Sequence, residues 1–413
     1  MSNQPWLRGN DFFVSPWNYD PEVTKDFNFA KKIKLHDVTL RDGEQQSGIT
    51  FRREDKIRIA DGLAAAGVHR IEAGMPVVSK DDKAAIQEIV KRNQAPGSPE
   101  IFAFARCMVQ DAVEAADCGV KGIVMEIPSS QHLIETAYKW SMEKSIDASI
   151  KATLKAKELG LYTAFFPIDC SRADVGWVLD LLERIAKDGH MDAVVLVDTF
   201  GGLGPHAIPQ LVKTVKARIP DKPIEVHFHD DFGMGAANTI MALAAGADVA
   251  HTTVTAIGER AGNAAYEDIA MALLTMYNVD IGINTKEIYP LSKLVRELAG
   301  IPVQPNRGLV GDDIFNIESG IITSWYKNVK DESLVTVFPV NPDFIGHKAA
   351  RVVLGKNSGI DSVWDYLTRT GQQDTTTLEE ANEMLAALKA KAYDKKALLS
   401  DAEFAEIVKA VKK

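Results

Sequence analysis

The sequence predicts an α/β protein: a (β/α)₈ barrel followed by a mainly helical C-terminal region. Short apolar, β-rich runs recur eight times between residues 33 and 258, and segments with a helical spacing of apolar residues lie between them. Eight strands that alternate with helices over about 230 residues are typical of such a barrel. A doubly wound sheet is the alternative, but RDGEQQSG follows the first run where that fold usually carries a glycine-rich phosphate-binding loop. The pattern therefore favours the barrel.

The expected strands are rich in β-branched and aromatic residues, which fit a pleated and buried sheet. They are residues 33–40, 69–75, 100–106, 122–128, 162–170, 193–199, 224–230 and 249–258. Helical spacing is clearest in REDKIRIADGLAAAG (53–67) and NTIMALAAGA (238–247), where a glycine follows the last apolar residues.

We expect three regions along the chain. Residues 1–30, which are rich in aromatic side chains, form an arm packed on the same subunit or on a partner. Residues 31–285 form the catalytic barrel, and residues 286–413 form a helical lid or dimerisation region. The last helix is expected to begin at a Ser-x-x-Glu-like capping sequence, SDAE.

Composition excludes several functions. The 413 residues include 47 Lys and Arg against 57 Asp and Glu, a net charge of −10, which argues against binding to nucleic acid or to an anionic membrane. No apolar run is long enough to span a membrane, and the amino terminus does not resemble a signal peptide, so we expect a cytoplasmic protein. Three cysteines without a C-x-x-C pair exclude a disulfide scaffold.

Polar residues gather at the carboxyl ends of the expected strands, where (β/α)₈ barrels place their catalytic groups. His227 and His229 are two residues apart on a strand and so share a face. With Asp42 from the end of the first strand, they form a candidate His₂–carboxylate site for Mg²⁺, Mn²⁺ or Zn²⁺. An H-x-H pair alone is weak evidence, but its position at the barrel rim favours a metal site over a structural role.

Arg41 directly precedes Asp42, so a rim turn is needed to bring both side chains to the barrel mouth. There, Arg41 can bind a carboxylate or stabilise an enolate, and the alternative is a salt bridge to Glu72 on the second strand. Thr199 is a candidate hydroxyl donor to a substrate carboxylate, and Arg172, just after the fifth strand, is a further candidate for substrate binding. These residue types are compatible with aldol or Claisen chemistry, decarboxylation and metal-assisted hydrolysis.

Several segments closely resemble the signatures of the DRE-TIM metallolyase superfamily, which contains isopropylmalate, homocitrate and citramalate synthases and hydroxymethylglutaryl-CoA lyase. These segments are LHDVTLRDGEQQSGITF (35–51), VHFHDDFG (226–233), IGERAGNAAYED (257–268) and, in the C-terminal region, VLGKNSG (353–359). GERAGN is the form that the synthases carry, whereas the lyases carry a cysteine in this loop. The resemblance therefore favours a synthase.

The resemblance also implies roles for particular residues. Asn263 is expected to join Asp42, His227 and His229 as a metal ligand or a close neighbour. Arg41 is expected to stabilise the enolate, Glu72 to support the site, and Thr199 to contact a 2-oxoacid. His132 occupies the region of a synthase S-x-I-H element near the 2-oxoacid side chain, and its alternative is a surface loop position.

Three positions depart from the synthase pattern. The segment that usually reads H-E-S-G-I-H has isoleucine at both histidine positions, Ile317 and Ile322, and Ile168 stands where a glutamate is common. Because an aliphatic side chain cannot transfer a proton, the catalytic base is unassigned.

The resemblance implies Claisen condensation of an acyl-CoA, most simply acetyl-CoA, with a 2-oxoacid to give a 2-substituted malate-like hydroxy acid. The enzyme would be an acyltransferase that converts acyl to alkyl on transfer, and it would be a homodimer. A metal-dependent carbon–carbon lyase or aldolase that cleaves a 3-hydroxy acid or its CoA ester is the main alternative. A binding or regulatory subunit without catalysis is a third.

Overall fold

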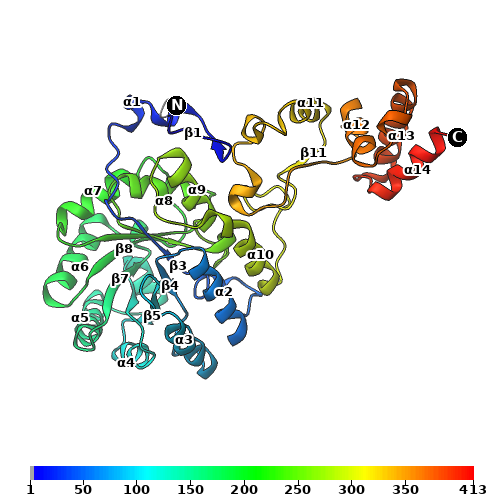
Figure 1. Ribbon diagram of the computed structural model, residues 1–413. Helices are drawn as coiled ribbons and strands as arrows, with labels where there is room; N and C mark the ends of the chain where they lie inside the picture. The colour runs from blue at the N-terminus through cyan, green and yellow to red at the C-terminus, as the bar shows by residue number, and fades with distance from the viewer. Residues whose placement is uncertain (1–3) are drawn as a thin grey trace. The chain divides into compact units, whose positions relative to one another are not determined.

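Eight parallel strands close into a barrel, which confirms the predicted fold (Figure 1). The strands are β3 (Lys34–Asp37), β4 (Arg70–Glu72), β5 (Glu100–Arg106), β6 (Gly122–Pro128), β7 (Tyr162–Ile168), β8 (Ala193–Asp198), β9 (Ile224–Phe228) and β10 (Val249–Thr252). They follow one another around the barrel in chain order, and β10 pairs with β3 to close it. Each predicted run contains one strand. The last run was expected to reach residue 258, but Thr255 and Ala256 have positive φ, which ends the extended backbone.

Helices follow the strands and cover the outside of the barrel (Figure 1). They are α2 (Arg53–Ala65), α3 (Lys80–Arg92), α4 (Val109–Asp117), α5 (Met142–Glu158), α6 (Val175–Asp188), α7 (Ile208–Arg218), α8 (Gly235–Ala244) and α9 (Tyr266–Met276). Gly67 after α2 and Gly246 after α8 have φ of +80° and +105°, as the sequence predicts for glycines that end helices. A further helix, α10 (Ile288–Ala299), packs against α2.

The computed structural model describes residues 4–413, which fall into two compact units. Residues 16–303 form the barrel unit, and residues 304–413 form the second unit together with the amino-terminal segment up to Ser15. The expected arm is thus shared between the units. Its residues 1–3 lie outside the described part. Phe27 and Phe29 pack on Tyr277 in the barrel unit, and the short α1 (Pro21–Thr24) precedes them.

Among residues 4–15 and 304–413, the second unit contains short strands and four α-helices. The strands are β1 (Leu7–Arg8), β2 (Phe12–Phe13), β11 (Asn316–Ile317) and β12 (Arg351–Val352), and the helices are α11 (Gly320–Val329), α12 (Ile360–Arg369), α13 (Leu378–Lys395) and α14 (Asp401–Val411). Helices α12 to α14 share a hydrophobic core that includes Leu367, Leu388 and Phe404. The predicted cap of the last helix is present: Ser400 Oγ accepts from the Glu403 amide, and the Glu403 carboxylate accepts from the Ser400 amide.

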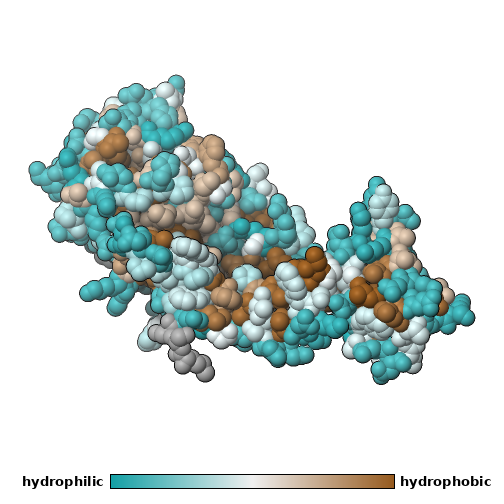
Figure 2. Space-filling model, turned by 90° about the horizontal axis from the view of Figure 1, so that it is seen from above, coloured by the Kyte–Doolittle hydropathy of each residue, from teal (hydrophilic) through white to brown (hydrophobic). Residues whose placement is uncertain are grey.

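Hydrophilic side chains dominate the face of the molecule shown in Figure 2, and smaller hydrophobic areas lie between them. Among residues 4–413, no helix combines the length and the apolar character that crossing a membrane requires. The three cysteines are free thiols, and all are buried.

The interior of the barrel has a polar half and an apolar half. Alternate residues of each strand point inward, so the inner face of a strand is read at every second position. The inward residues of β3, β4, β9 and β10 are polar and buried: His36, Arg70, Glu72, Glu225, His227 and His251. The residues that form the buried cluster of β5 to β8 are apolar and include Phe102, Phe104, Val124, Phe166, Val195 and Val197. The charged half therefore faces an aromatic and aliphatic wall.

Candidate active site

Asp42, His227 and His229 meet at the carboxyl end of the barrel. His227 lies in β9 and His229 just beyond it, while Asp42 follows β3 and immediately precedes the short 3₁₀ helix η2 (Gly43–Gln45). The two histidine Nε2 atoms are 3.3 Å apart, and they lie 3.7 Å and 3.9 Å from Asp42 Oδ2. All three side chains are buried, so three potential ligand atoms converge on one small volume.

The protonation of these groups suits a divalent cation. His229 Nδ1 lies 3.1 Å from the Gly262 carbonyl oxygen and can only donate to it, which leaves the lone pair of the neutral ring on Nε2. Burial lowers the pKa of both His227 and His229, and for His227 the neighbouring His229 lowers it further. Two neutral imidazoles beside a carboxylate form a donor set that fits Mg²⁺, Mn²⁺ or Zn²⁺.

The loop that contains GERAGN holds Asp42 from the other side. Asn263 Nδ2 donates to Asp42 Oδ1 at 2.7 Å, and the Glu259 amide donates to the same oxygen at 3.2 Å. Asn263 Oδ1 is buried and has no hydrogen-bond partner within residues 4–413, as expected of a ligand or close neighbour of a cation. Gly258 has φ of +154°, and a Cβ there would lie 2.2 Å from Asn263 Nδ2. Only glycine permits this approach.

The rim turn expected at Arg41 is present. Arg41 Nη1 donates to Asp42 Oδ2 at 2.9 Å, and Nε donates to Glu72 Oε1. Arg41 Nη2 is buried without a hydrogen-bond partner among the described residues, and the guanidinium lies 4.0 Å over the ring of Phe104. The salt bridge to Glu72 thus coexists with a donor that remains available for a substrate oxygen.

Glu72 is fully buried but stays ionised. Burial raises its pKa, yet the Arg41 charge and the His36 ring, whose Nε2 is 3.3 Å from Glu72 Oε2, together lower it to about 2. A carboxylate with so low a pKa cannot serve as an acid or a base near neutral pH. Its geometry instead suits a residue that holds the Arg41 guanidinium in position.

A second buried polar cluster lies deeper in the barrel. The rings of His36 and His251 stack at 4.4 Å, His251 Nε2 lies 3.0 Å from Glu225 Oε2, and Arg70 Nη1 donates to Glu225 Oε1 at 2.7 Å. These groups also offer three potential ligand atoms. Glu225 is already paired with Arg70, however, and two nearly parallel rings direct their nitrogen lone pairs side by side rather than toward one point. The cluster therefore fits a network of buried charges better than a second metal site.

The other candidate substrate-binding residues gather around Asp169, which follows β7. Thr199 Oγ1 accepts from the Asp169 amide at 2.8 Å, and Arg172 Nε donates to Asp169 Oδ1 at 2.7 Å. His132 Nε2 lies 3.4 Å from Asp169 Oδ2, although just over half of the His132 side chain is exposed. None of the described hydrogen bonds joins Thr199, Arg172 or His132 to a metal-ligand candidate. Arg260 pairs with Asp231, two residues after His229, and donates to the Thr199 carbonyl.

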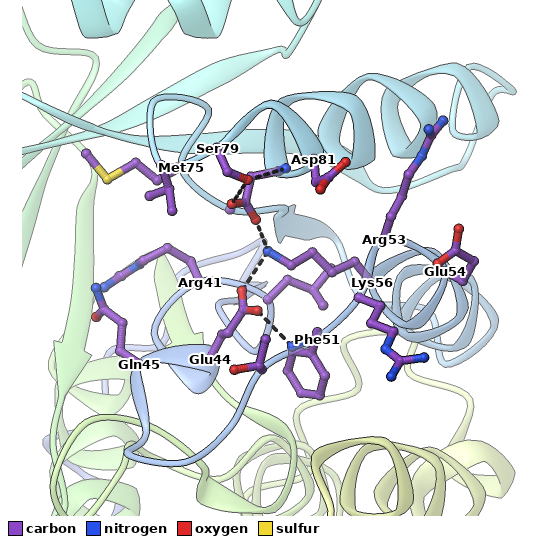
Figure 3. A pocket seen from close by; sticks show the side chains of 16 residues that line it. Arg41, Glu44, Gln45, Phe51, Arg53, Glu54, Lys56, Met75, Ser79 and Asp81 are labelled. Carbon is purple, nitrogen blue, oxygen red and sulfur yellow. Dashed lines mark hydrogen bonds and ion pairs between the residues drawn. The ribbon is translucent and has the colours of Figure 1, made fainter.

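A pocket of about 780 Å³ opens beside Arg41 (Figure 3). Its wall is built from the segment after β3, the start of α2 and the segment after β4, and it includes Gln45, Phe51 and Met75. Lys56 ties these segments together, because its Nζ lies 2.6 Å from Glu44 and also pairs with Asp82. The volume is typical of a small-molecule site.

A family model described as HMGL-like matches residues 32–295. The chain belongs to the HMGL-like family. Similar proteins include a homocitrate synthase of Methanothermobacter thermautotrophicus, 34% identical over 97% of this chain and 98% of the relative, and 2-isopropylmalate synthase 2 of Caldanaerobacter subterraneus, 34% identical over 91% and 95%. The solved HMG-CoA lyase of Bacillus subtilis covers 67% of this chain and 96% of its own, with a TM-score of 0.59 at 24% identity, and shows the shared fold. The resemblance to DRE-TIM metallolyases is confirmed.

Sequence reasoning missed two features of this HMGL-like barrel. The cluster around His36, Glu225 and His251 was detectable, because Glu225 stands two residues before His227 and so shares its inward face. The gathering of substrate candidates around Asp169 was not, because it depends on a left-handed backbone at Asp169, with φ of +63°. Nothing in a strand pattern predicts that conformation at a residue other than glycine.

Proposed function

We propose that this chain catalyses the divalent-metal-dependent Claisen condensation of an acyl-CoA, most simply acetyl-CoA, with a 2-oxoacid. The product would be a 2-substituted malate-like hydroxy acid, released with CoA after water cleaves the thioester. One observation carries the proposal: Arg41, with its free Nη2 donor, is hydrogen-bonded to Asp42 of the metal-ligand cluster. The groups for both reactants therefore lie within one hydrogen bond of each other, as bond formation between two bound carbons requires.

In this proposal, Asp42, His227 and His229 hold the cation, with Asn263 as a fourth ligand or close neighbour. The bound cation would act as a Lewis acid on the keto group of the 2-oxoacid. Arg41 Nη2 would donate to the enolate oxygen of the thioester, where negative charge develops. Glu72 would keep the guanidinium in place.

We assign the cluster around Asp169 to recognition of the 2-oxoacid. Thr199 Oγ1 accepts from a backbone amide, so its proton is left to donate to a substrate carboxylate. Arg172 and His132 would contact the remainder of the 2-oxoacid from the same rim.

The pocket beside Arg41 is the candidate site for the acyl-CoA. Arg41 lines it, so a thioester bound in this pocket would lie beside the Arg41 side chain. Arg52 and Arg53 also line the pocket and are exposed. Their positive charges would attract the phosphates of CoA locally, although the net charge of the whole chain is negative.

The test is release of free CoA thiol from acetyl-CoA by the purified protein with Mg²⁺, Mn²⁺ or Zn²⁺. A panel of 2-oxoacids with methyl, isopropyl or carboxyethyl side chains supplies the second substrate. Release that requires one of them and stops with a chelator would support the proposal. Release from none, together with cleavage of a 3-hydroxy acid or its CoA ester, would establish the lyase alternative. A folded protein that binds none of the three metals would favour the non-catalytic alternative.

We further propose that the enzyme is a cytoplasmic homodimer. Helix α11 supports the dimer, because Ile321 and Trp325 lie one turn apart on it and are 66% and 53% exposed. Light scattering of the purified protein measures the mass directly, and a monomer at micromolar concentration would contradict the dimer.

A further inference from the structure

One carboxylate on the apolar half of the barrel has no role in the site described so far. Glu126 lies in β6, two residues after Val124, which packs in the interior cluster with Phe104 and Phe166. Because alternate strand residues share a face, the Glu126 side chain points inward as well, one step closer to the barrel mouth. Its neighbours on the adjacent strands are Arg106 of β5 and Phe166 of β7.

This position faces Arg41. The Arg41 guanidinium lies 4.0 Å from the ring centre of Phe104 and 5.8 Å from that of Phe166. These two phenylalanines belong to β5 and β7, the strands that flank β6. The Phe166 ring also lies 5.1 Å from the ring of His227. Arg41 and Glu126 attract each other electrostatically. Glu126 therefore stands at the side of the space between Arg41 and the metal-ligand candidates.

The carboxylate of Glu126 is unusual in making no hydrogen bond or ion pair with any residue from 4 to 413. Arg106 cannot satisfy it, since its guanidinium is held by Asp111 at 2.8 Å and 3.0 Å. Glu126 is partly buried in this apolar wall, and a carboxylate held there without a protein partner costs free energy, which a purely structural role does not explain.

The charged groups around Glu126 are Arg41 and Arg106, which favour its ionised form, and Asp111 and Glu72, which oppose it. The Tyr138 hydroxyl is also near and feels its charge. Burial outweighs the two arginines and raises the pKa of Glu126 to about 7. Two carboxylates thus flank Arg41 with opposite properties: Glu72 is permanently ionised, whereas Glu126 exchanges its proton near neutral pH.

We infer that Glu126 is the catalytic base that removes the proton from the carbon next to the thioester carbonyl of the acyl-CoA. The inference rests on the proposed condensation and fills the role that the sequence leaves open at Ile168 and Ile322. The C–H bond breaks, its proton goes to the Glu126 carboxylate, and its electron pair forms the enolate whose oxygen Arg41 Nη2 holds. The enolate carbon then bonds to the keto carbon, and the proton on Glu126 passes to the new alkoxide oxygen.

The experiment compares wild type, Glu126→Gln and the matched control Glu135→Gln, which alters an exposed acid beyond β6. We expect Glu126→Gln to lower kcat for CoA release by about 100-fold or more while KM for the 2-oxoacid changes less than threefold. The kcat of wild type should rise with pH through one ionisation near 7, because the base must be deprotonated, and this ionisation should be missing in Glu126→Gln. Glu135→Gln should behave as wild type.

Three outcomes would overturn the inference: kcat of Glu126→Gln within threefold of wild type, an unchanged pH profile, or a loss confined to KM. If Glu126→Gln does not fold, Glu126→Asp is measured instead. Glu126→Asp should have a lower kcat but keep the ionisation in its pH profile, and a pH profile without that ionisation contradicts the inference. A wild type that releases no CoA with any 2-oxoacid refutes the condensation itself. Measuring the variant with a deuterated acyl group distinguishes loss of the base from a structural defect that lowers kcat. Loss of the base makes proton removal slower and so increases the primary isotope effect on the residual rate, whereas a structural defect does not.

Discussion

Replacing Glu72 with glutamine should destabilise the protein and disable Arg41 at once. The substitution keeps the shape of the side chain but removes the charge that Arg41 Nε and His36 Nε2 contact in a fully buried position. The guanidinium would then keep one carboxylate partner, Asp42, which also belongs to the candidate metal-ligand cluster. Removing one partner of a buried ion pair typically costs about 3–5 kcal/mol, because the other charge stays buried without compensation.

The pKa of Glu72 provides a second estimate of the same loss. Its pKa falls from an ordinary value of 4.5 to about 2 in the folded protein, which corresponds to about 3 kcal/mol of stability at pH 7. Because the folded-state pKa is lowered, this stabilisation is complete above pH 4.5 and is lost as the pH falls toward 2. At pH 3.5, about 2 kcal/mol of it should remain.

Urea unfolding followed by circular dichroism measures both values. The free energy of unfolding of Glu72→Gln should lie about 3 kcal/mol below that of wild type at pH 7, and the difference should shrink to about 2 kcal/mol at pH 3.5. Glu135→Gln, which changes an exposed acid, serves as control and should stay within about 0.5 kcal/mol. A difference below 1 kcal/mol at pH 7, or one that does not change with pH, would show that Glu72 does not stabilise Arg41 as an ionised carboxylate.

Three further substitutions test the site. His229→Ala should weaken binding of Mn²⁺ or Zn²⁺ by about 100-fold in calorimetric titration. The control His206→Ala, which changes an exposed histidine, should not weaken it. If His229→Ala binds the metal as tightly as wild type, His229 is not a ligand. Gly258→Ala places a Cβ 2.2 Å from Asn263 Nδ2, so it should weaken metal binding and lower the melting temperature. The control is Gly371→Ala, because Gly371 also has a positive φ, +69°, but open space around it. This control should cost about 1 kcal/mol of stability and leave metal binding intact. Arg41→Lys keeps the positive charge but loses the forked guanidinium that contacts Asp42 and Glu72. The kcat for CoA release should therefore fall at least about tenfold, while metal affinity is retained. An unchanged kcat would contradict enolate stabilisation by Arg41.

The fold was predictable because its signals are local. Each barrel strand is marked by a short β-rich run, and Gly67 and Gly246 mark helix ends where a left-handed residue is required. The convergence of Asp42 with His227 followed from one global rule, that parallel strand ends meet at the same rim.

Other parts of the site depend on contacts that a single sequence does not encode in its periodicity. Glu126 looks like an ordinary polar residue near the end of the apolar run GIVMEIP. Only the packing of Phe104 and Phe166 around Arg41 shows that this acid faces the barrel mouth. The gathering of Thr199 and Arg172 at Asp169 depends in the same way on tertiary structure.

The division of the barrel interior has a consequence for how readily this enzyme can acquire new substrates. The buried charged groups inside the barrel lie on β3, β4, β9 and β10, whereas the opposite wall, apart from Glu126 on β6, consists of apolar side chains such as Val124, Val195 and Val197. Substitutions among apolar residues of similar volume usually cost little stability. A mutant library restricted to the inner positions of β5 to β8, with Glu126 left intact, would therefore vary the wall that faces Arg41 while the costly ionic framework stays untouched, and the panel of 2-oxoacids would show which substrates each variant accepts. The same separation gives natural variation single steps that alter this wall and preserve folding.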